Sequence, residues 1–85
     1  GRPCFYKGTF TVETPADTYL DVSGWGMGEV WVNGHYAGSY WEQNAQQSIQ
    51  LPAETLQKGA NSLTVFELKS NGKRTMRLSD KAIFN

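Results

Sequence analysis

The stretch of sequence that decides the fold is GEVWVNGHYAGSYW, residues 28–41. A short run of β-branched and aromatic residues, 30–32, is followed at once by Asn33-Gly34, and a second strand-like run begins at His35. Asn-Gly between two such runs is the strongest short-range signal for a β-hairpin, because a type I′ turn needs positive φ at both central residues. The stretch therefore predicts a two-residue turn, which also fixes the register of the two strands.

This register predicts which side chains share a face of the hairpin. The cross-strand pairs are Val32 with His35, Trp31 with Tyr36, and Val30 with Ala37. Since side chains alternate along a strand, Val30, Val32 and Ala37 share one face, which we expect to be core. Trp31 and Tyr36 share the other face. We expect at least one of these two rings to be partly exposed in the isolated chain and to form an interdomain contact.

The rest of the chain also alternates between apolar and polar residues with period 2. The expected strands cover residues 5–14, 18–23, 46–51, 62–69 and 74–79, with a short last one at 82–84. Their inward residues are Tyr6, Phe10, Val12, Leu20, Val22, Gln47, Ile49, Leu51, Met76 and Leu78. Strand 62–69 is apolar on both faces and is therefore expected to be central. One helical turn is expected at 53–56 and a second Asn-Gly turn at 70–73, while Gly8 suggests a bulge or a close backbone approach.

Six or seven short strands with turn signals between them predict an all-β fold, a small antiparallel β-sandwich or barrel. At 85 residues the chain is long enough for one small domain, residues 1–85. Its net charge of zero gives no general attraction to nucleic acid or to an anionic membrane, and no apolar run is long enough to span a bilayer. Cys4 is the only cysteine, so we expect a half-buried thiol and no intrachain disulfide.

Four segments carry a resemblance to a known family: FYKGTF (5–10), DTYLDVSGWGMGEVWVNGH (17–35), GSYW (38–41) and LTVFEL (63–68). They resemble the C-terminal jelly-roll domain of family 35 glycoside hydrolases, the β-galactosidases. The resemblance implies a galactose-binding-domain-like jelly roll, excised from the C-terminal region of a larger enzyme that is secreted, periplasmic or lysosomal. It also implies a separate (β/α)₈ catalytic barrel in the parent chain, which would be the partner of this module.

Two positions depart from the pattern of that family. The family usually has Arg in a GRYW motif, and this chain has Ser39. The family usually continues with Gly-Pro-Gln, and this chain has Asn44-Ala45-Gln46. If the family's arginine contacts the rest of the enzyme or a sugar, this contact is lost here.

The residues that could carry catalysis do not form a recognisable motif. Retaining glycosidases need two carboxyl groups about 5 Å apart, whereas the eight carboxylates here lie on expected solvent faces and turns. Asp21 and Glu67 interrupt apolar strands, so either could be a paired, partly buried structural carboxylate. His35 has no visible orienting partner and no metal-ligand spacing occurs. We therefore expect no catalytic residues, no metal and no cofactor.

Two functions remain open. Sugar recognition needs flat aromatic faces together with convergent amides or carboxylates, and the candidate residues are Trp25, Tyr40, Trp41, Glu42, Gln43 and Asn44. The module would then bind galactose-containing glycans. Alternatively Tyr40 and Trp41 are packing residues, and the chain is a structural module that contacts its parent enzyme through Trp31 and Tyr36. The sequence favours the structural reading and does not decide between them.

Overall fold

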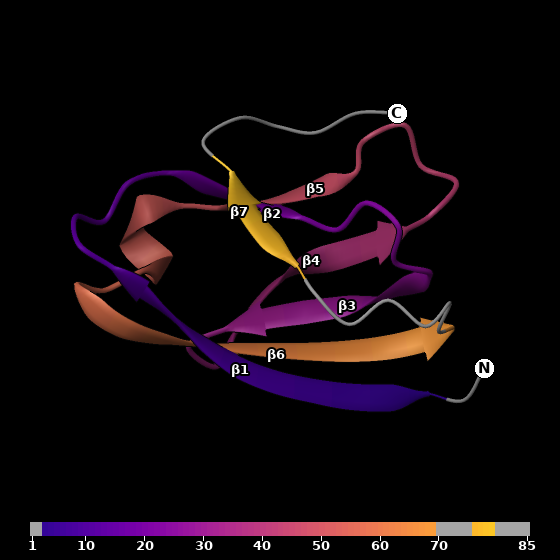
Figure 1. The fold of residues 1–85 in the computed structure, drawn as a ribbon, viewed down its shortest axis with the longest axis horizontal. Coiled ribbons are helices and arrows are strands. Elements are labelled where there is room, and N and C mark those ends of the chain that lie inside the picture. The colour runs from indigo at the N-terminus through magenta and orange to yellow at the C-terminus, as the bar shows by residue number, and fades with distance from the viewer. Residues whose placement is uncertain (1–2, 70–75, 80–85) are drawn as a thin grey trace.

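The computed structural model describes residues 3–69 and 76–79 and shows two antiparallel sheets packed face to face (Figure 1). The strands are β1 (Cys4–Val12), β2 (Thr18–Asp21), β3 (Met27–Val32), β4 (His35–Trp41), β5 (Ser48–Leu51), β6 (Gly59–Lys69) and β7 (Arg77–Ser79), with a 3₁₀ turn η1 (Ala53–Thr55). The four-stranded sheet has the order β1-β6-β3-β4 and the three-stranded sheet has the order β5-β2-β7. The predicted β-sandwich and the helical turn are confirmed, whereas the predicted elements at 70–73 and 82–84 lie outside the described residues.

The core lies between the two sheets and is built from alternate residues of each strand. Its buried apolar side chains are Leu20, Val22, Trp25, Val30, Val32, Tyr40, Ile49, Leu51, Leu56 and Val65. The inward residues predicted for β2 and β5 are all among the buried ones, Gln47 included. Strand β6 lies between β1 and β3, as its two apolar faces predicted.

The Asn33-Gly34 turn has the predicted backbone. Asn33 has φ 51° and Gly34 has φ 81°, so both central residues are left-handed, as a type I′ turn requires. The Asn33 side chain adds long-range bonds: its Oδ1 accepts from the Ser62 N–H, and its Nδ2 donates to the Thr55 carbonyl and to Asn61 Oδ1, all at 2.9 Å. The turn is thereby tied to both η1 and β6.

The predicted hairpin register holds next to the turn and is wrong beyond it. Trp31 pairs with Tyr36 as expected, but Val30 pairs with Gly38 rather than with Ala37. Ala37 is thus the extra residue of a β-bulge, in which two residues of one strand oppose one residue of the other. Gly38 has φ 151°, a conformation that side-chain-bearing residues rarely adopt, and a Cβ there would lie 3.3 Å from Ile49 Cγ2. Glycine at this position allows both the bulge and the close contact with β5.

The bulge reverses which residues of β4 point inward. In an unbroken register Tyr40 would lie on the same face as Tyr36. The extra residue instead places Tyr40 opposite Gly28, on the core face, and it is 4% exposed. Gly28 is needed there, because a Cβ would lie 2.3 Å from the Phe66 carbonyl oxygen and 2.6 Å from the Tyr40 hydroxyl. Ser39 and Trp41, which flank Tyr40 in β4, consequently point outward.

Two smaller expectations are corrected. Gly8 marks neither a bulge nor a close approach, since β1 pairs with β6 without interruption and a Cβ at Gly8 would meet nothing within 4 Å. Leu78 is in register with Leu20, on the inner side of its sheet, yet it is 42% exposed. Its strand β7 lies at the edge of the three-stranded sheet, which leaves the side chain only partly covered.

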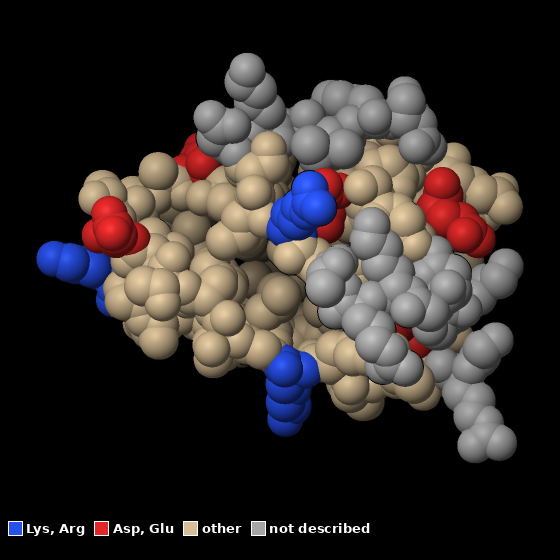
Figure 2. Space-filling model, in the orientation of Figure 1, with Lys and Arg blue, Asp and Glu red and all other residues tan. Residues whose placement is uncertain are grey.

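Within the described residues, no helix is long and apolar enough to span a membrane. The same residues contain no group of three or more His, Cys, Asp or Glu side chains that could hold a metal ion. On the face shown in Figure 2, positive and negative side chains are scattered among neutral ones.

Candidate functional site

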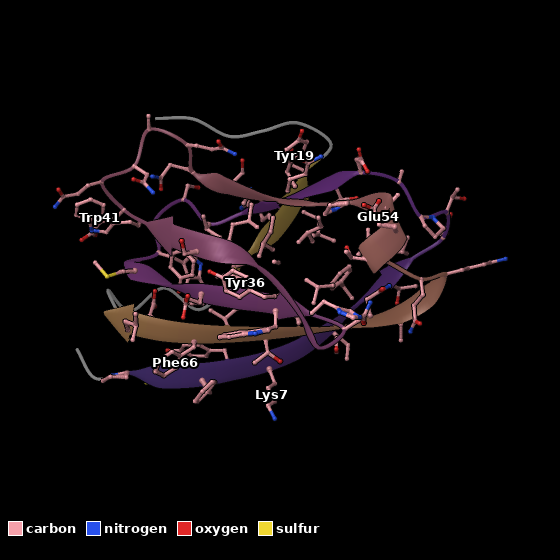
Figure 3. All side chains as sticks on the ribbon, turned by 180° about the vertical axis from the view of Figure 1, so that it is seen from behind. Lys7, Tyr19, Tyr36, Trp41, Glu54 and Phe66 are labelled. Carbon is pink, nitrogen blue, oxygen red and sulfur yellow. The ribbon has the colours of Figure 1, made fainter. Side chains whose placement is uncertain are left out.

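The outer face of the four-stranded sheet carries most of the exposed apolar surface. Among residues 3–69 and 76–79, five large hydrophobic side chains are exposed, and four of them lie on this sheet: Phe5 (65%), Tyr36 (55%), Leu68 (41%) and Trp41 (40%). The fifth, Leu78, belongs to the other sheet. Figure 3 shows Tyr36, Trp41 and Phe66 on the ribbon of the four-stranded sheet. The prediction that Trp31 or Tyr36 is partly exposed is confirmed.

The aromatic rings on this face form two pairs, and we call the surface made by their four residues, Phe5, Phe66, Trp31 and Tyr36, the aromatic face. Phe5 and Phe66 stack with centroids 4.5 Å apart, and Trp31 meets Tyr36 edge-to-face at 5.7 Å. The Tyr36 hydroxyl donates to Glu29 Oε1 at 3.1 Å, and partial desolvation together with this bond raises the pKa of Tyr36. Each ring packs against a partner ring on the neighbouring strand, so the face presents two paired sets of aromatic side chains.

A shallow depression of about 430 Å³ lies at one end of this sheet, and we call it the Trp41 depression. Its lining includes Met27, Glu29, Ser39, Trp41, Asn44 and Leu68. One exposed indole therefore stands beside a carboxylate, a hydroxyl and an amide. This combination of an apolar ring with a few convergent polar groups is typical of carbohydrate sites. Ser39, which replaces the arginine of the resembling family, lines this depression.

Gln47 supports the loop that borders the Trp41 depression. It is 3% exposed, and its amide nitrogen donates to the carbonyl oxygens of Trp41, Glu42 and Asn44. The loop is tied at its start as well, where the Glu42 N–H donates to the Gly26 carbonyl at 2.7 Å. Trp41 and Asn44 are thus held by a buried side chain. The sequence placed Gln47 inward but gave no sign of this supporting role.

A buried carboxylate lies behind the depression. Glu67 is 0% exposed; its Oε1 accepts from the Tyr40 hydroxyl at 2.8 Å and from the Gly26 N–H at 3.1 Å, while its Oε2 has no hydrogen-bond partner. The pKa of Tyr40 is raised well above its usual range, mainly by burial and to a smaller extent by the hydrogen bond and charge of Glu67. The expectation of a buried structural carboxylate holds for Glu67. Asp21 is half-buried and accepts locally from Ser23.

The structure separates the predicted sugar-contacting residues into two groups. Trp25 and Tyr40 are core residues, 2% and 4% exposed, and Trp25 packs edge-to-face against Tyr6 and Tyr40. Neither ring offers a face to solvent. Trp41 and Asn44 are brought together in the Trp41 depression, which Tyr40 also lines with the little surface that it exposes, whereas Glu42 is half-buried and Gln43 is exposed.

Cys4 is half-buried near the chain start, as predicted. His35 is exposed directly after the turn.

Comparison with known proteins gives the family. A family model described as "Beta-galactosidase, galactose-binding domain" matches residues 3–61. The chain belongs to this family. It is 39% identical over 66 residues to human Beta-galactosidase-1-like protein 2, 40% identical over 73 residues to Beta-galactosidase 17 of Arabidopsis thaliana, and 36% identical over 74 residues to human Beta-galactosidase.

These matches cover 76%, 81% and 79% of this chain but only 10%, 10% and 11% of the respective relatives. The chain thus spans about a tenth of the relatives' length. It is a non-catalytic β-sandwich module of the kind found in β-galactosidases, as the resemblance implied.

Proposed function

We propose that this galactose-binding-domain module packs against the catalytic part of a β-galactosidase chain through its aromatic face. The observation that carries the proposal is the gathering of four of the five exposed large hydrophobics on one sheet. Contiguous apolar patches on small soluble proteins mark interaction sites. In the relatives a domain of this size makes up about a tenth of the chain, so a covering partner within the same chain is available.

Burial of the aromatic face would stabilise such an arrangement substantially. Covering a large apolar side chain contributes about 1.5–3 kcal/mol. Phe5 and Tyr36 are both more than half exposed, so together they would contribute a few kcal/mol. Because their rings are already held by Phe66 and Trp31, little side-chain entropy is lost on docking.

The test introduces Phe5→Ser and Tyr36→Ser together into the chain and into a full-length parent that contains it. We expect the parent to become sensitive to proteolysis around the module and to lose more thermal stability than the isolated 85-residue chain, which loses only the two ring pairs and the Tyr36–Glu29 hydrogen bond. Leu78→Ser is the matched control, because Leu78 is similarly exposed but lies on the other sheet. A parent that tolerates the double variant as well as the control would refute docking through this face.

A second candidate function is binding of a galactoside in the Trp41 depression. The specific observation is the exposed indole of Trp41 beside Glu29, Ser39 and Asn44. The family description, a galactose-binding domain, agrees with such a site. The two functions are compatible, since the exposed docking rings Phe5 and Tyr36 do not line the Trp41 depression.

The galactoside proposal is tested by titrating the chain with D-galactose and following Trp fluorescence and backbone amide shifts. We expect saturable changes around Trp41, and their loss in Trp41→Ala. Phe5→Ala is the control, because it removes an exposed ring of the same sheet outside the depression. Two results would count against the site: equal responses of the two variants to galactose, or no saturable response of the unmodified chain.

A further inference from the structure

Three depressions follow one another along β4, the outermost strand of its sheet, beside β5. The first is the Trp41 depression. A central one of about 270 Å³ shares Ser39 and Asn44 with it, and a third of about 330 Å³ shares Ala37 and Gln50 with the central one. The shared lining residues make them one continuous groove, which we call the β4 groove. Figure 3 shows Trp41 and Tyr36 at separate positions along β4.

The chemistry of the central part is polar and uncharged. Its polar lining residues are Ser39, Asn44, Gln46, Ser48 and Gln50, and Ala37, Gly38 and Ile49 complete the lining. Gln46 is held in place, since its amide nitrogen donates to the Ser48 carbonyl at 3.2 Å. Amides and hydroxyls without a formal charge suit a neutral ligand that carries many hydroxyl groups. Such a lining offers no cation to a phosphate backbone.

The two ends of the groove add apolar and aromatic contacts. Trp41 lies at one end, and Tyr36, His35 and Pro52 line the other. Tyr36 and Trp41 lie opposite Trp31 and Met27, four residue steps apart on β3, which correspond to about 13 Å at the usual rise per residue of a strand. This length exceeds a single sugar ring and suits a short linear oligosaccharide.

An extended peptide is a poorer fit to the same groove. A peptide that adds to a sheet edge needs an uninterrupted row of backbone donors and acceptors. The bulge at Ala37 interrupts the ladder of β4 near its middle, and bulges at edges protect sheets against such pairing.

We propose that the β4 groove binds a neutral linear oligosaccharide of two or three sugars, with Trp41 holding one terminal sugar and the Asn44, Gln46 and Gln50 amides contacting the following ones. This inference rests on the second proposed function, galactoside binding at Trp41, and extends it from a single sugar to a chain. The module would then hold the parent enzyme on a polymeric or branched galactan rather than on free galactose.

The experiment compares D-galactose with a linear β-galactotriose on the ¹⁵N-labelled chain. We expect galactose to shift amides around Trp41 only, and the triose to shift also those of Gln46, Ser48 and Gln50. The triose should bind about tenfold more tightly. Gln50→Ala should weaken triose binding about threefold to tenfold, the equivalent of one neutral hydrogen bond, and leave galactose affinity unchanged. Gln43→Ala is the matched control, since Gln43 is exposed in the adjoining loop and lines none of the three depressions.

The outcomes separate the two proposals. If the triose binds no more tightly than galactose and shifts only residues around Trp41, the β4 groove is overturned while the single-sugar site stands. If neither sugar binds, both proposals fail. Shifts confined to Phe5 and Phe66, which line none of the three depressions, would also overturn the groove. If Gln50→Ala does not fold, the amide shifts of the unmodified chain with the two sugars are sufficient to decide between these outcomes.

Discussion

Removal of the Tyr40 hydroxyl should destabilise this module more than the loss of a single oxygen atom suggests. In Tyr40→Phe the ring stays, so no cavity forms, but Glu67 Oε1 loses a donor at 2.8 Å. The carboxylate is 0% exposed and its Oε2 already has no partner, so one N–H at 3.1 Å would be its remaining donor. Hydrogen bonds to charged groups contribute about 1.5–3 kcal/mol, and an unsatisfied buried group adds to the loss. We expect a cost of about 2–3 kcal/mol.

The assay is urea denaturation followed by Trp fluorescence, with thermal unfolding in parallel. For a domain of this size about 2–3 kcal/mol corresponds to a fall in melting temperature of roughly 10–20 °C. Tyr19→Phe is the control, because Tyr19 is half-buried on the three-stranded sheet and makes no contact with Glu67; it should cost under about 0.5 kcal/mol.

A double-mutant cycle with Glu67→Gln tests the cause. The amide is neutral, so the Tyr40 hydroxyl should contribute only about 0.5–1.5 kcal/mol in its presence. A coupling energy near zero, or a loss below about 0.5 kcal/mol for Tyr40→Phe itself, would refute the view that this bond stabilises the buried carboxylate.

Three further predictions follow from backbone and side-chain geometry. Gly28→Ala should destabilise the fold by about 3 kcal/mol or more, because the new Cβ would lie 2.3 Å from the Phe66 carbonyl oxygen. Gly8→Ala should be neutral or stabilise the fold by about 0.5 kcal/mol, because a Cβ there would meet nothing within 4 Å. Chemical denaturation of the two variants compares these free energies directly. Gly34→Val should cost well over 1 kcal/mol, because a β-branched residue is strained at φ 81°, and an unchanged melting temperature would contradict the turn type. The free energy of unfolding should fall as the pH rises above about 10. The unfolded chain releases the Tyr40 proton near the ordinary pKa of tyrosine, whereas the folded chain, which raises this pKa, retains the proton. When the free energy of unfolding is measured between pH 8 and 12, this decrease should be smaller in Tyr40→Phe.

The sequence predicted most of the fold because its signals were local. Alternation located the strands, and Asn33-Gly34 set the first pairs of the hairpin. The bulge could not be predicted in the same way, because it depends on the contact between Gly38 and Ile49 in the other sheet. The pairing of Val30 with Ala37 was therefore wrong.

The candidate site was predicted less well, since its residues were judged from composition. Trp25 lies among three glycines and suggested an exposed loop ring, but its neighbours in space are Tyr6 and Tyr40. Burial of this kind arises from long-range packing, which period-2 patterns do not report. Trp41 and Asn44 were found because they are close in sequence, whereas the distant partners Glu29 and Leu68 were not.

The bulge in β4 lets this strand lose one residue without changing its pairing. Tyr36 pairs with Trp31 and Gly38 with Val30, so deletion of Ala37 would keep both pairs and restore an unbroken ladder. Every side chain from Gly38 to Trp41 would stay on its present side, with Tyr40 inward and Trp41 outward. Deletion of Ser39 would instead move Tyr40 opposite Glu29, on the outer face, and Trp41 opposite Gly28, on the core face. A natural variant of this domain that is one residue shorter at the bulge should therefore keep its aromatic residues in the same order, whereas one that is shorter beyond the bulge should not.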